Sequence, residues 1–369
     1  MLQLQHVSKS FKETAAVKDM NIDVKKSEVF VLFGPTGAGK TTTLRLAAGL
    51  ETPDRGSIFL AGEDVTEKES WKRNVAIMFE GLNLFPIYTV YDNIAFALRS
   101  EIYRQPEEEI KRRIEKVSRD LHIQHLLERK PGTLSGGEIQ RAALARSLVR
   151  HPFLYLLDEP LSNLDLKLRE ELRVELKELH KHYDATILFA THDYTTVVSM
   201  ADRIGVIYDG RLQQVGTQDE IFESPETVVV ARFMGSPAMN LLSVQRDGQQ
   251  LVSTQDPHFA FQVFERDLHG TESGTGDLWF GIWPEDVDVS LQPKDGFLQG
   301  KIVGQEFRGM DRVISIGIGE ESVKKVVGPS FPAHYGDDCW FSYQQERVYL
   351  FKKDSGLRIN FKPTASPAS

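Results

Sequence analysis

The segment GPTGAGKT (34–41) places glycines, a lysine and a hydroxyl residue at a spacing that suits phosphate binding. It follows the apolar run VFVLF (29–33) and opens a helical stretch, which is the context that this pattern requires. Glycines let backbone N–H groups close around phosphate oxygens, and the start of the helix adds positive potential. Lys40 would contact the β- and γ-phosphates, and the Thr41 hydroxyl would bind Mg²⁺. The alternative is a Gly-rich turn with a surface lysine. The candidate nucleotide-binding residues here are Gly34, Pro35, Thr36, Gly37, Ala38, Gly39, Lys40, Thr41 and Thr42.

Two adjacent carboxylates end a second apolar run, FLYLLDEP (153–160). Burying Asp158 and Glu159 without partners would be costly, so a nearby cation explains them best. Asp158 would hold Mg²⁺, directly or through water, and Glu159 would polarise an attacking water. By themselves the two acids could equally cap the next element, but a phosphate loop in the same chain favours nucleotide hydrolysis.

The segment LSGGEIQRAALARSL (134–148) begins a helix with two glycines in its first turn. Ser135 and Glu138 fit the S-x-x-E capping box, in which the two residues satisfy each other's backbone N–H groups. That structural role does not explain Gly136 and Gly137, which lower helix propensity. Without side chains there, N–H groups at the positive end of the helix are open to an anion. We therefore add Ser135, Gly136 and Gly137 to the candidate nucleotide-binding residues.

Taken in order, these motifs resemble those of the ATP-binding cassette (ABC) ATPases, and the resemblance covers residues 1–235. GPTGAGKT matches the family's phosphate loop, LSGGE its signature motif, and LLDEP its metal-binding and catalytic strand. SNLD (162–165) matches the loop that couples paired sites, and THD (191–193) supplies the switch histidine, His192. Phe11 stands where the family stacks an aromatic ring on adenine.

The resemblance implies a head-to-tail dimer that binds ATP and Mg²⁺ between its subunits. Lys40, Thr41 and Asp158 would bind the triphosphate and the metal within one subunit. Ser135 and Gly137 of the partner subunit would close over the γ-phosphate.

Three further residues take roles in the same site by resemblance. Glu159 would be the general base, and His192 would contact the γ-phosphate. Asp165 would belong to the nucleotide site as part of the coupling loop. Each of the last two also has a local reading, His192 as a polar strand end and Asp165 as the cap of the following helix.

Glu80, in VAIMFEG (75–81), falls where the family carries glutamine. A glutamate keeps an oxygen ligand for Mg²⁺, but it loses the amide donor and brings negative charge toward a triphosphate. We expect Glu80 to be a catalytic and metal-site residue. We also expect a site that binds Mg·ATP but hydrolyses it slowly alone, relying on a partner with glutamine there. A polar strand end is the alternative.

Alternating strands and helices must position these motifs. Apolar runs of strand length occur at 29–33, 57–60, 75–79, 153–157, 186–190 and 204–208, and helical patterns separate most of them. This favours an α/β ABC ATPase P-loop domain over 1–235, with a largely parallel sheet buried on both faces. Residues from about 82 to 150 predict a helical subdomain. Further patterns predict one helix that begins at Pro106 and another over about 166–183.

After GSPAMN (235–240) the helical patterns stop. Short segments such as LWFGIW and RVISIGIG, separated by Gly, Asp and Pro, predict a small all-β domain over 236–369. This region resembles the accessory, OB- or TOBE-like domain of maltose-type importer ATPases through GSPAMNLL (235–242) and GIWPEDV (281–287). Trp283 stands where arginine is usual. The resemblance implies carbohydrate, polyol or glycerol-type cargo.

The same resemblance implies membrane partners. A coupling helix of a permease would dock near the helical subdomain. The expected partners are a second ABC ATPase, in a homodimer or a heterodimer, two permease subunits and, through the complex, an extracytoplasmic solute-binding protein. The chain would then be a peripheral protein at the cytoplasmic face of the membrane.

The composition limits other classes of function. The net charge of −9 over 369 residues argues against broad binding of nucleic acid. The single cysteine, Cys339, permits no intramolecular disulfide, which fits a reducing cytosol. No run approaches the roughly 18 apolar residues of a membrane helix, and no signal peptide is read at the N-terminus. The alternatives to an importer are a weakly hydrolysing partner in a heterodimer and a soluble ABC ATPase that acts on nucleic acid or ribosomes.

Overall fold

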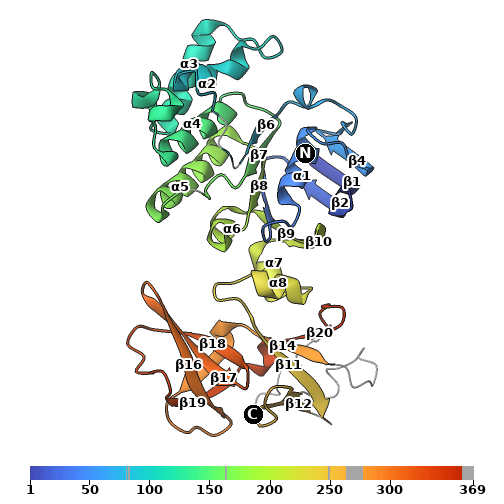
Figure 1. The fold of residues 1–369 in the computed structure, drawn as a ribbon, viewed down its shortest axis with the longest axis vertical. Coiled ribbons are helices and arrows are strands. Elements are labelled where there is room, and N and C mark those ends of the chain that lie inside the picture. The colour runs from blue at the N-terminus through green and yellow to red at the C-terminus, as the bar shows by residue number, and fades with distance from the viewer. Residues whose placement is uncertain (80, 82–83, 163, 248–249, 263–276, 360–369) are drawn as a thin grey trace. The chain divides into compact units, whose positions relative to one another are not determined.

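The computed structural model describes all residues except 80, 82–83, 163, 248–249, 263–276 and 360–369 (Figure 1). Contacts divide the chain into two compact units, Met1–Asp219 and Glu220–Ser369. This division precedes the boundary that the sequence indicates near residue 235, because helix α8 (Val228–Phe233) bonds to later residues. The backbone N–H of Val228 donates to the Gly356 carbonyl at 2.8 Å.

The first unit begins with a four-stranded antiparallel sheet in the order β2-β1-β4-β5. Its strands are β1 (Leu2–Phe11), β2 (Thr14–Val24), β4 (Arg55–Leu60) and β5 (Glu63–Asp64). Leu2 and Leu4 are buried while Gln3 is exposed, the alternation of a strand with one face in the core. The strand expected at 57–60 forms within β4, but it belongs to this sheet because it pairs antiparallel with β1.

A six-stranded sheet in the order β10-β9-β3-β8-β7-β6 forms the centre of this unit. Its strands are β3 (Val29–Phe33), β6 (Val75–Met78), β7 (Leu154–Asp158), β8 (Ile187–Thr191), β9 (Arg203–Tyr208) and β10 (Arg211–Gly216). Only β10 is antiparallel to its neighbour. Every residue of β3, β7 and β8 is buried, as in parallel sheets covered on both faces. The expected α/β architecture is confirmed, and the carboxyl ends of these three strands meet at one edge.

Helices pack around this sheet and extend to one side of it. Helices α1 (Lys40–Ala48) and α6 (Tyr194–Met200) pack against the central strands, and α5 (Leu166–Tyr183) packs against α6. Figure 1 shows α2 (Val90–Arg99), α3 (Glu107–Asp120) and α4 (Gly136–Leu148) grouped beyond the β6 edge. Short 3₁₀ turns lie at Ser70–Lys72, Gln124–Leu126 and Pro131–Thr133. Helix α3 begins directly after Pro106, and α5 spans the predicted range.

The second unit contains two five-stranded antiparallel sheets, which confirms the expected β domain. One sheet comprises β11 (Asn240–Asp247), β12 (Gln250–Ser253), β13 (Ala260–Gln262), β14 (Leu278–Ile282) and β20 (Val348–Lys352). The other comprises β15 (Val287–Ser290), β16 (Leu298–Arg308), β17 (Asp311–Ile318), β18 (Glu321–Val327) and β19 (Asp338–Tyr343). The short helix α7 (Gln218–Glu223) precedes α8, and 3₁₀ turns lie at Pro284–Asp286 and Gln345–Arg347. Trp283 is fully buried, and its ring stacks on Phe222 at a centroid distance of 4.1 Å.

Candidate nucleotide site

The phosphate loop connects β3 to α1, and its glycines are required by the backbone. Gly37 and Gly39 have φ of 81° and 104°, a left-handed region that favours glycine. A Cβ at Gly39 would lie 2.4 Å from the Ala16 carbonyl oxygen, and one at Gly34 would lie 2.1 Å from the Ile207 carbonyl oxygen. The loop can therefore take this path only with glycines at these positions.

Lys40, the first residue of α1, is directed into the loop and toward the carboxylates. Its Nζ donates to the carbonyl oxygens of Gly34 at 2.8 Å and Pro35 at 3.1 Å. The same Nζ lies 3.6 Å from Oε1 of Glu159. Both charged side chains are at most 9% exposed, so their attraction is weakly screened by water. The ammonium group is thus held at the mouth of the loop, where phosphate oxygens would replace its present partners.

The two expected carboxylates end β7, and both are buried. Asp158 is 3% exposed and Glu159 is 8% exposed. Glu159 has φ of 46°, a conformation that is rare for a residue with a side chain and is often found at functional sites. Its backbone N–H donates to the Ala190 carbonyl of the neighbouring strand at 3.0 Å, which fixes this turn against β8.

Glu159 is the centre of a hydrogen-bonded group at the strand ends. Its Oε1 lies 2.8 Å from Nδ1 of His192, and its Oε2 accepts from the Thr191 hydroxyl at 3.2 Å. The His192 side chain is 55% exposed, so this ring lies between the buried carboxylate and solvent. Sequence reasoning missed Thr191, although it directly precedes His192 at the end of β8. Its hydroxyl also accepts from the backbone N–H of Asp193, which orients it toward Glu159.

One cavity of about 220 Å³ joins the loop to these strand ends. Its lining residues are Ala16, Thr36, Gly37, Gly39, Lys40, Thr41, Thr42, Asp158, Glu159 and His192. Gly34 and Pro35 take part through their carbonyl contacts with Lys40, and Ala38 is buried behind the loop. The structure therefore brings together residues from three separate sequence motifs.

The oxygen donors in this cavity suit Mg²⁺. The Thr41 hydroxyl and the Asp158 carboxylate line it together, and hard oxygen ligands are what Mg²⁺ prefers. Among the described residues, no three His, Cys, Asp or Glu side chains gather into a metal cage. That agrees with the usual binding of Mg²⁺ by one or two carboxylates together with substrate phosphates. The residues present thus fit a metal that arrives with a nucleotide.

The described residues of the signature segment and of the coupling loop do not line this cavity. Ser135 caps α4, and the reciprocal bonds of the expected capping box with Glu138 are present. Gly136 has open space around its position, whereas a Cβ at Gly137 would lie 2.0 Å from a methyl carbon of Leu168. Asp165 caps α5 by accepting from the Leu168 N–H at 2.9 Å, as its local reading predicts.

Phe11 ends β1 and also lies outside the cavity lining. It is 41% exposed, and Nζ of Lys9 lies 5.5 Å from its ring centre. An exposed ring beside a cation is available for stacking on an aromatic base. Glu80 and Asn163 lie outside the described residues.

A second hollow, with a volume of about 590 Å³, lies between the sheet edge and the helical subdomain. Its walls include β6, α2 and α4, and its lining is mostly apolar with two arginines. We call it the β6 groove, and its residues are Ser70, Trp71, Val75, Ala76, Ile77, Met78, Phe79, Ala97, Tyr103, Ala143, Arg146, Ser147 and Arg150. Trp71 is 51% exposed, and burial lowers the pKa of Arg146.

Within the described part of the chain, no helix is long and apolar enough to cross a membrane.

Comparison with known proteins gives a consistent set of relatives. The profile described as ABC transporter matches residues 17–162. The uncharacterized ABC transporter ATP-binding protein YurJ of Bacillus subtilis is 37% identical, over 96% of this chain and 98% of its own length. The trehalose/maltose import ATP-binding protein MalK of Thermococcus litoralis is 36% identical, over 97% and 99%. The oligosaccharides import ATP-binding protein MsmX of Bacillus subtilis is also 36% identical, over 97% and 99%.

Solved structures resemble about 60% of the chain. The ATP-binding cassette MJ0796, a dimer in a post-hydrolysis state bound to ADP and Pi, is 27% identical with a TM-score of 0.54. The match covers 59% of this chain and 98% of that one. The structure of cbiO1 from Clostridium perfringens is 29% identical with a TM-score of 0.55, over 60% and 90%.

Proposed function

This chain is an ATPase of the ABC transporter family, and on that premise we propose that it drives an importer for a carbohydrate, polyol or glycerol-type solute. The convergence of Lys40, Thr41, Asp158, Glu159 and His192 on one cavity carries the proposal for the ATP site. The near full-length similarity to import ATP-binding proteins supports the transport role.

We propose a part for each of these side chains in hydrolysis. Lys40 exchanges its carbonyl partners for the β- and γ-phosphates, and Thr41 and Asp158 supply oxygen ligands for Mg²⁺. Mg²⁺, when bound, neutralises charge that develops on the phosphate oxygens. Glu159 takes a proton from water as the water oxygen bonds to the γ-phosphorus. The bond to the β–γ bridging oxygen then breaks and leaves ADP and inorganic phosphate.

His192 positions the base and contacts the γ-phosphate. Its Nδ1 holds one oxygen of Glu159 at 2.8 Å, and Thr191 holds the other oxygen. A carboxylate held at both oxygens loses rotational freedom, which favours attack by an oriented water. The second ring nitrogen of His192 faces the nucleotide in this proposal.

The site would be completed by a second ATPase subunit. Ser135 and Gly137 belong to the nucleotide site by family pattern, yet neither lines the cavity of its own chain. The capping box of Ser135 and Glu138 closes part of the α4 N-terminus, but Gly136 in its first turn has open space around it, where another chain's γ-phosphate would fit. The dimer of MJ0796 supports this arrangement, which we propose to be head to tail.

The β6 groove is the proposed docking site for a permease helix. It offers an apolar surface with Arg146 and Arg150 at its wall, so a helix with apolar and acidic or carbonyl groups would fit. Its wall includes Met78 of β6, which pairs with Leu157 of β7 directly before Asp158, so docking there would reach the ATP site through neighbouring strands. The ATPase would then be peripheral, at the cytoplasmic face of the membrane, with two permease subunits and a solute-binding protein in the complex.

Affinity purification from solubilised membranes tests the transport role. The tagged chain should carry two membrane proteins, and Trp71→Ala should release them because Trp71 is an exposed wall of the β6 groove. Val174→Ala, which removes a similarly exposed apolar side chain from α5, is the matched control and should retain them. Tight association with RNA or ribosomes in place of membrane proteins would overturn the importer assignment.

A weakly hydrolysing partner in a heterodimer is the second candidate, and the acid at position 80 favours it. A carboxylate within a few ångströms of a triphosphate costs several kcal/mol at an effective dielectric of about 20, before Mg²⁺ offsets it. Glu80→Gln should then raise the ATPase rate of the assembled complex and change its Mg²⁺ dependence. An unchanged rate would show that the acid is tolerated, and the homodimeric importer would stand.

A further inference from the structure

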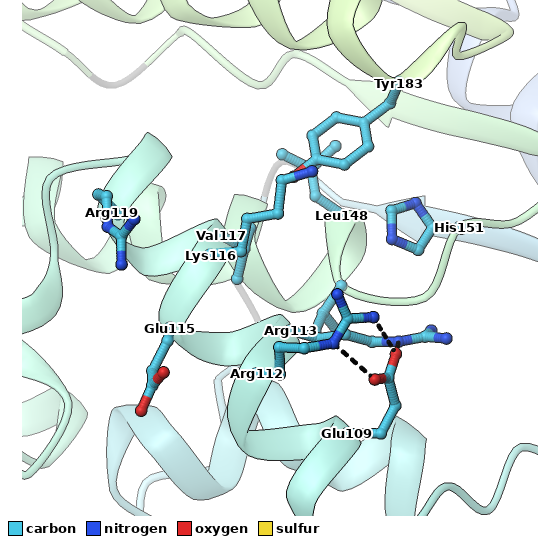
Figure 2. Close-up of a pocket in the computed structure, with 11 residues that line it drawn as sticks. Glu109, Arg112, Arg113, Glu115, Lys116, Val117, Arg119, Leu148, His151 and Tyr183 are labelled. Carbon is cyan, nitrogen blue, oxygen red and sulfur yellow. Dashed lines mark hydrogen bonds and ion pairs between the residues drawn. The ribbon is translucent and has the colours of Figure 1, made fainter.

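A separate cavity of about 290 Å³ lies beside α3 and shares no lining residue with the nucleotide cavity. Its walls come from α3, the end of α4, the segment before β7 and the end of α5 (Figure 2). We call it the α3 cavity, and the residues that matter to its chemistry are Glu109, Arg112, Arg113, Lys116, His151 and Tyr183. None of these belongs to the motifs that identify the ATPase.

Cations outnumber carboxylates in this cavity. Glu109 pairs with Arg112 at 2.7 Å and with Arg113 at 2.6 Å, so one negative charge serves two guanidinium groups. Nζ of Lys116 lies 4.4 Å from the Tyr183 ring centre and, within the described residues, forms no ion pair. Figure 2 shows Glu115 and Arg119, which also line the cavity, pointing away from this group. The space between Lys116 and Arg113 therefore has excess positive charge.

His151 lines the same cavity and lies within the electrostatic influence of these cations. Burial lowers the pKa of His151, and the positive charges of Arg113 and Lys116 lower it further. Burial disfavours any charge, so only the part of the shift that comes from Arg113 and Lys116 bears on an anion, and that part favours one. Glu109 acts in the opposite direction but does not reverse the shift.

Two aromatic rings line the cavity next to the cations. The centroids of His151 and Tyr183 are 5.0 Å apart with planes inclined by 47°. The Tyr183 hydroxyl donates to Oδ2 of Asp120 at 2.9 Å, which holds that ring in place. A compact organic group would pack on these rings, while a charged end reaches Lys116.

The size of the α3 cavity distinguishes among anionic ligands. Small-molecule sites begin at a volume of about 300 Å³, whereas a protein partner needs several hundred Å² of open surface. Two guanidinium groups and an ammonium group suit a dianion with three acceptor oxygens better than a single carboxylate. We propose that the α3 cavity binds a small phosphate monoester, with the phosphate between Lys116 and Arg113 and the organic group against Tyr183 and His151.

Calorimetric titration of the full-length protein with glucose 6-phosphate tests the proposal. The nucleotide site is first filled with Mg²⁺ and a non-hydrolysable ATP analogue, so that the phosphate loop cannot bind the probe. The parent should bind saturably with a Kd below about 1 mM. Lys116→Gln should weaken binding at least about tenfold, because it removes a charge-assisted contact with the phosphate.

Lys111→Gln is the matched control. Lys111 is an exposed lysine on the same helix that does not line the cavity, so the variant should bind within about twofold of the parent. Equal weakening by Lys116→Gln and Lys111→Gln would show diffuse attraction and overturn the site. No saturable binding to the parent would also overturn it. Inorganic phosphate binding as tightly as the ester would overturn the role of the rings. The α3 cavity shares no lining residue with the nucleotide cavity, so loss of ATPase activity in a variant such as Glu159→Gln does not bear on this test.

Discussion

Glu159→Gln is the sharpest test of the proposed mechanism, because it changes one atom in a fully described group of contacts. The amide oxygen can still accept from the Thr191 hydroxyl, so the side chain should keep its place. The change removes the negative charge 3.6 Å from Nζ of Lys40 and the proton acceptor 2.8 Å from Nδ1 of His192. Geometry is retained while the base is lost.

Glu159→Gln should have a large effect on the rate of hydrolysis and a small effect on the affinity for ATP. Loss of a general base lowers the rate by about 10²- to 10⁴-fold, equivalent to about 3–5 kcal/mol in the barrier. The attraction between Glu159 and Lys40 is of order 4 kcal/mol at an effective dielectric of about 20, and desolvation offsets most of it. Freed from this carboxylate, Lys40 should hold phosphates at least as tightly. We therefore expect ATP to bind normally or better while hydrolysis nearly stops.

Steady-state ATPase assays and equilibrium binding of ATP, performed on the same preparations, measure the two effects. Glu178→Gln, an exposed carboxylate on α5, is the matched control and should leave both unchanged. A Glu159→Gln rate within about threefold of the parent would refute the general-base role. Loss of ATP binding would instead show that Glu159 is needed to hold the site together.

Three further changes test other parts of the structure. Phe11→Ala should weaken ATP binding by about tenfold if the exposed ring stacks on adenine, since stacking contributes about 1–3 kcal/mol per base. Nucleotide titration measures the Kd for ATP, and an unchanged Kd would remove Phe11 from the site. Ser135→Ala should destabilise the first unit by about 1 kcal/mol near neutral pH by removing the α4 cap. Hydrogen bonds from the backbone and hydroxyl of Ser135 lower the pKa of Glu138, so their stabilisation is present above the ordinary pKa of 4.5 and lost as pH falls through the folded value. The difference in stability between parent and variant should therefore narrow in acid, because the bond from the Ser135 hydroxyl to the Glu138 carboxylate is lost there, while the part due to the cap of the Glu138 N–H remains. A difference that does not change with pH would contradict this. Trp283→Ala should lower the free energy of unfolding of the second unit by about 3–5 kcal/mol, because a buried ring that stacks on Phe222 is lost. Calorimetry should then show the unfolding transition at a lower temperature, and an unshifted transition would refute that packing.

Sequence patterns with a local physical cause were informative about the fold. The capping box of Ser135 and Glu138 and the Asp165 cap form because each needs only residues three positions apart. Helix α5 occupies the predicted range, since its apolar period and end signals are local as well. The parallel sheet follows from alternating strands and helices. The left-handed φ of Gly37 and Gly39 is a further reason for glycine in the phosphate loop, which the structure shows.

Arrangements that depend on distant segments could not be predicted in the same way. The run at 57–60 predicts a strand, but nothing local indicates that it pairs with β1 and not with the parallel sheet. The buried stacking of Trp283 on Phe222, and the place of α8 in the second unit, likewise depend on distant contacts. Strand pairing is decided by which faces must be covered, which is a property of the whole fold.

The sequence by itself determined the kind of chemistry: a phosphate loop, a pair of strand-end carboxylates and a histidine in the order of an ABC ATPase. The tertiary structure decided how they meet, with Glu159 between Lys40 and His192 and held by Thr191. It also revealed the cations and rings of the α3 cavity, which no linear motif marks. The physical reason is that a motif fixes local backbone and residue type. The charge environment of a side chain is set by strands and helices that the chain brings together only when it folds.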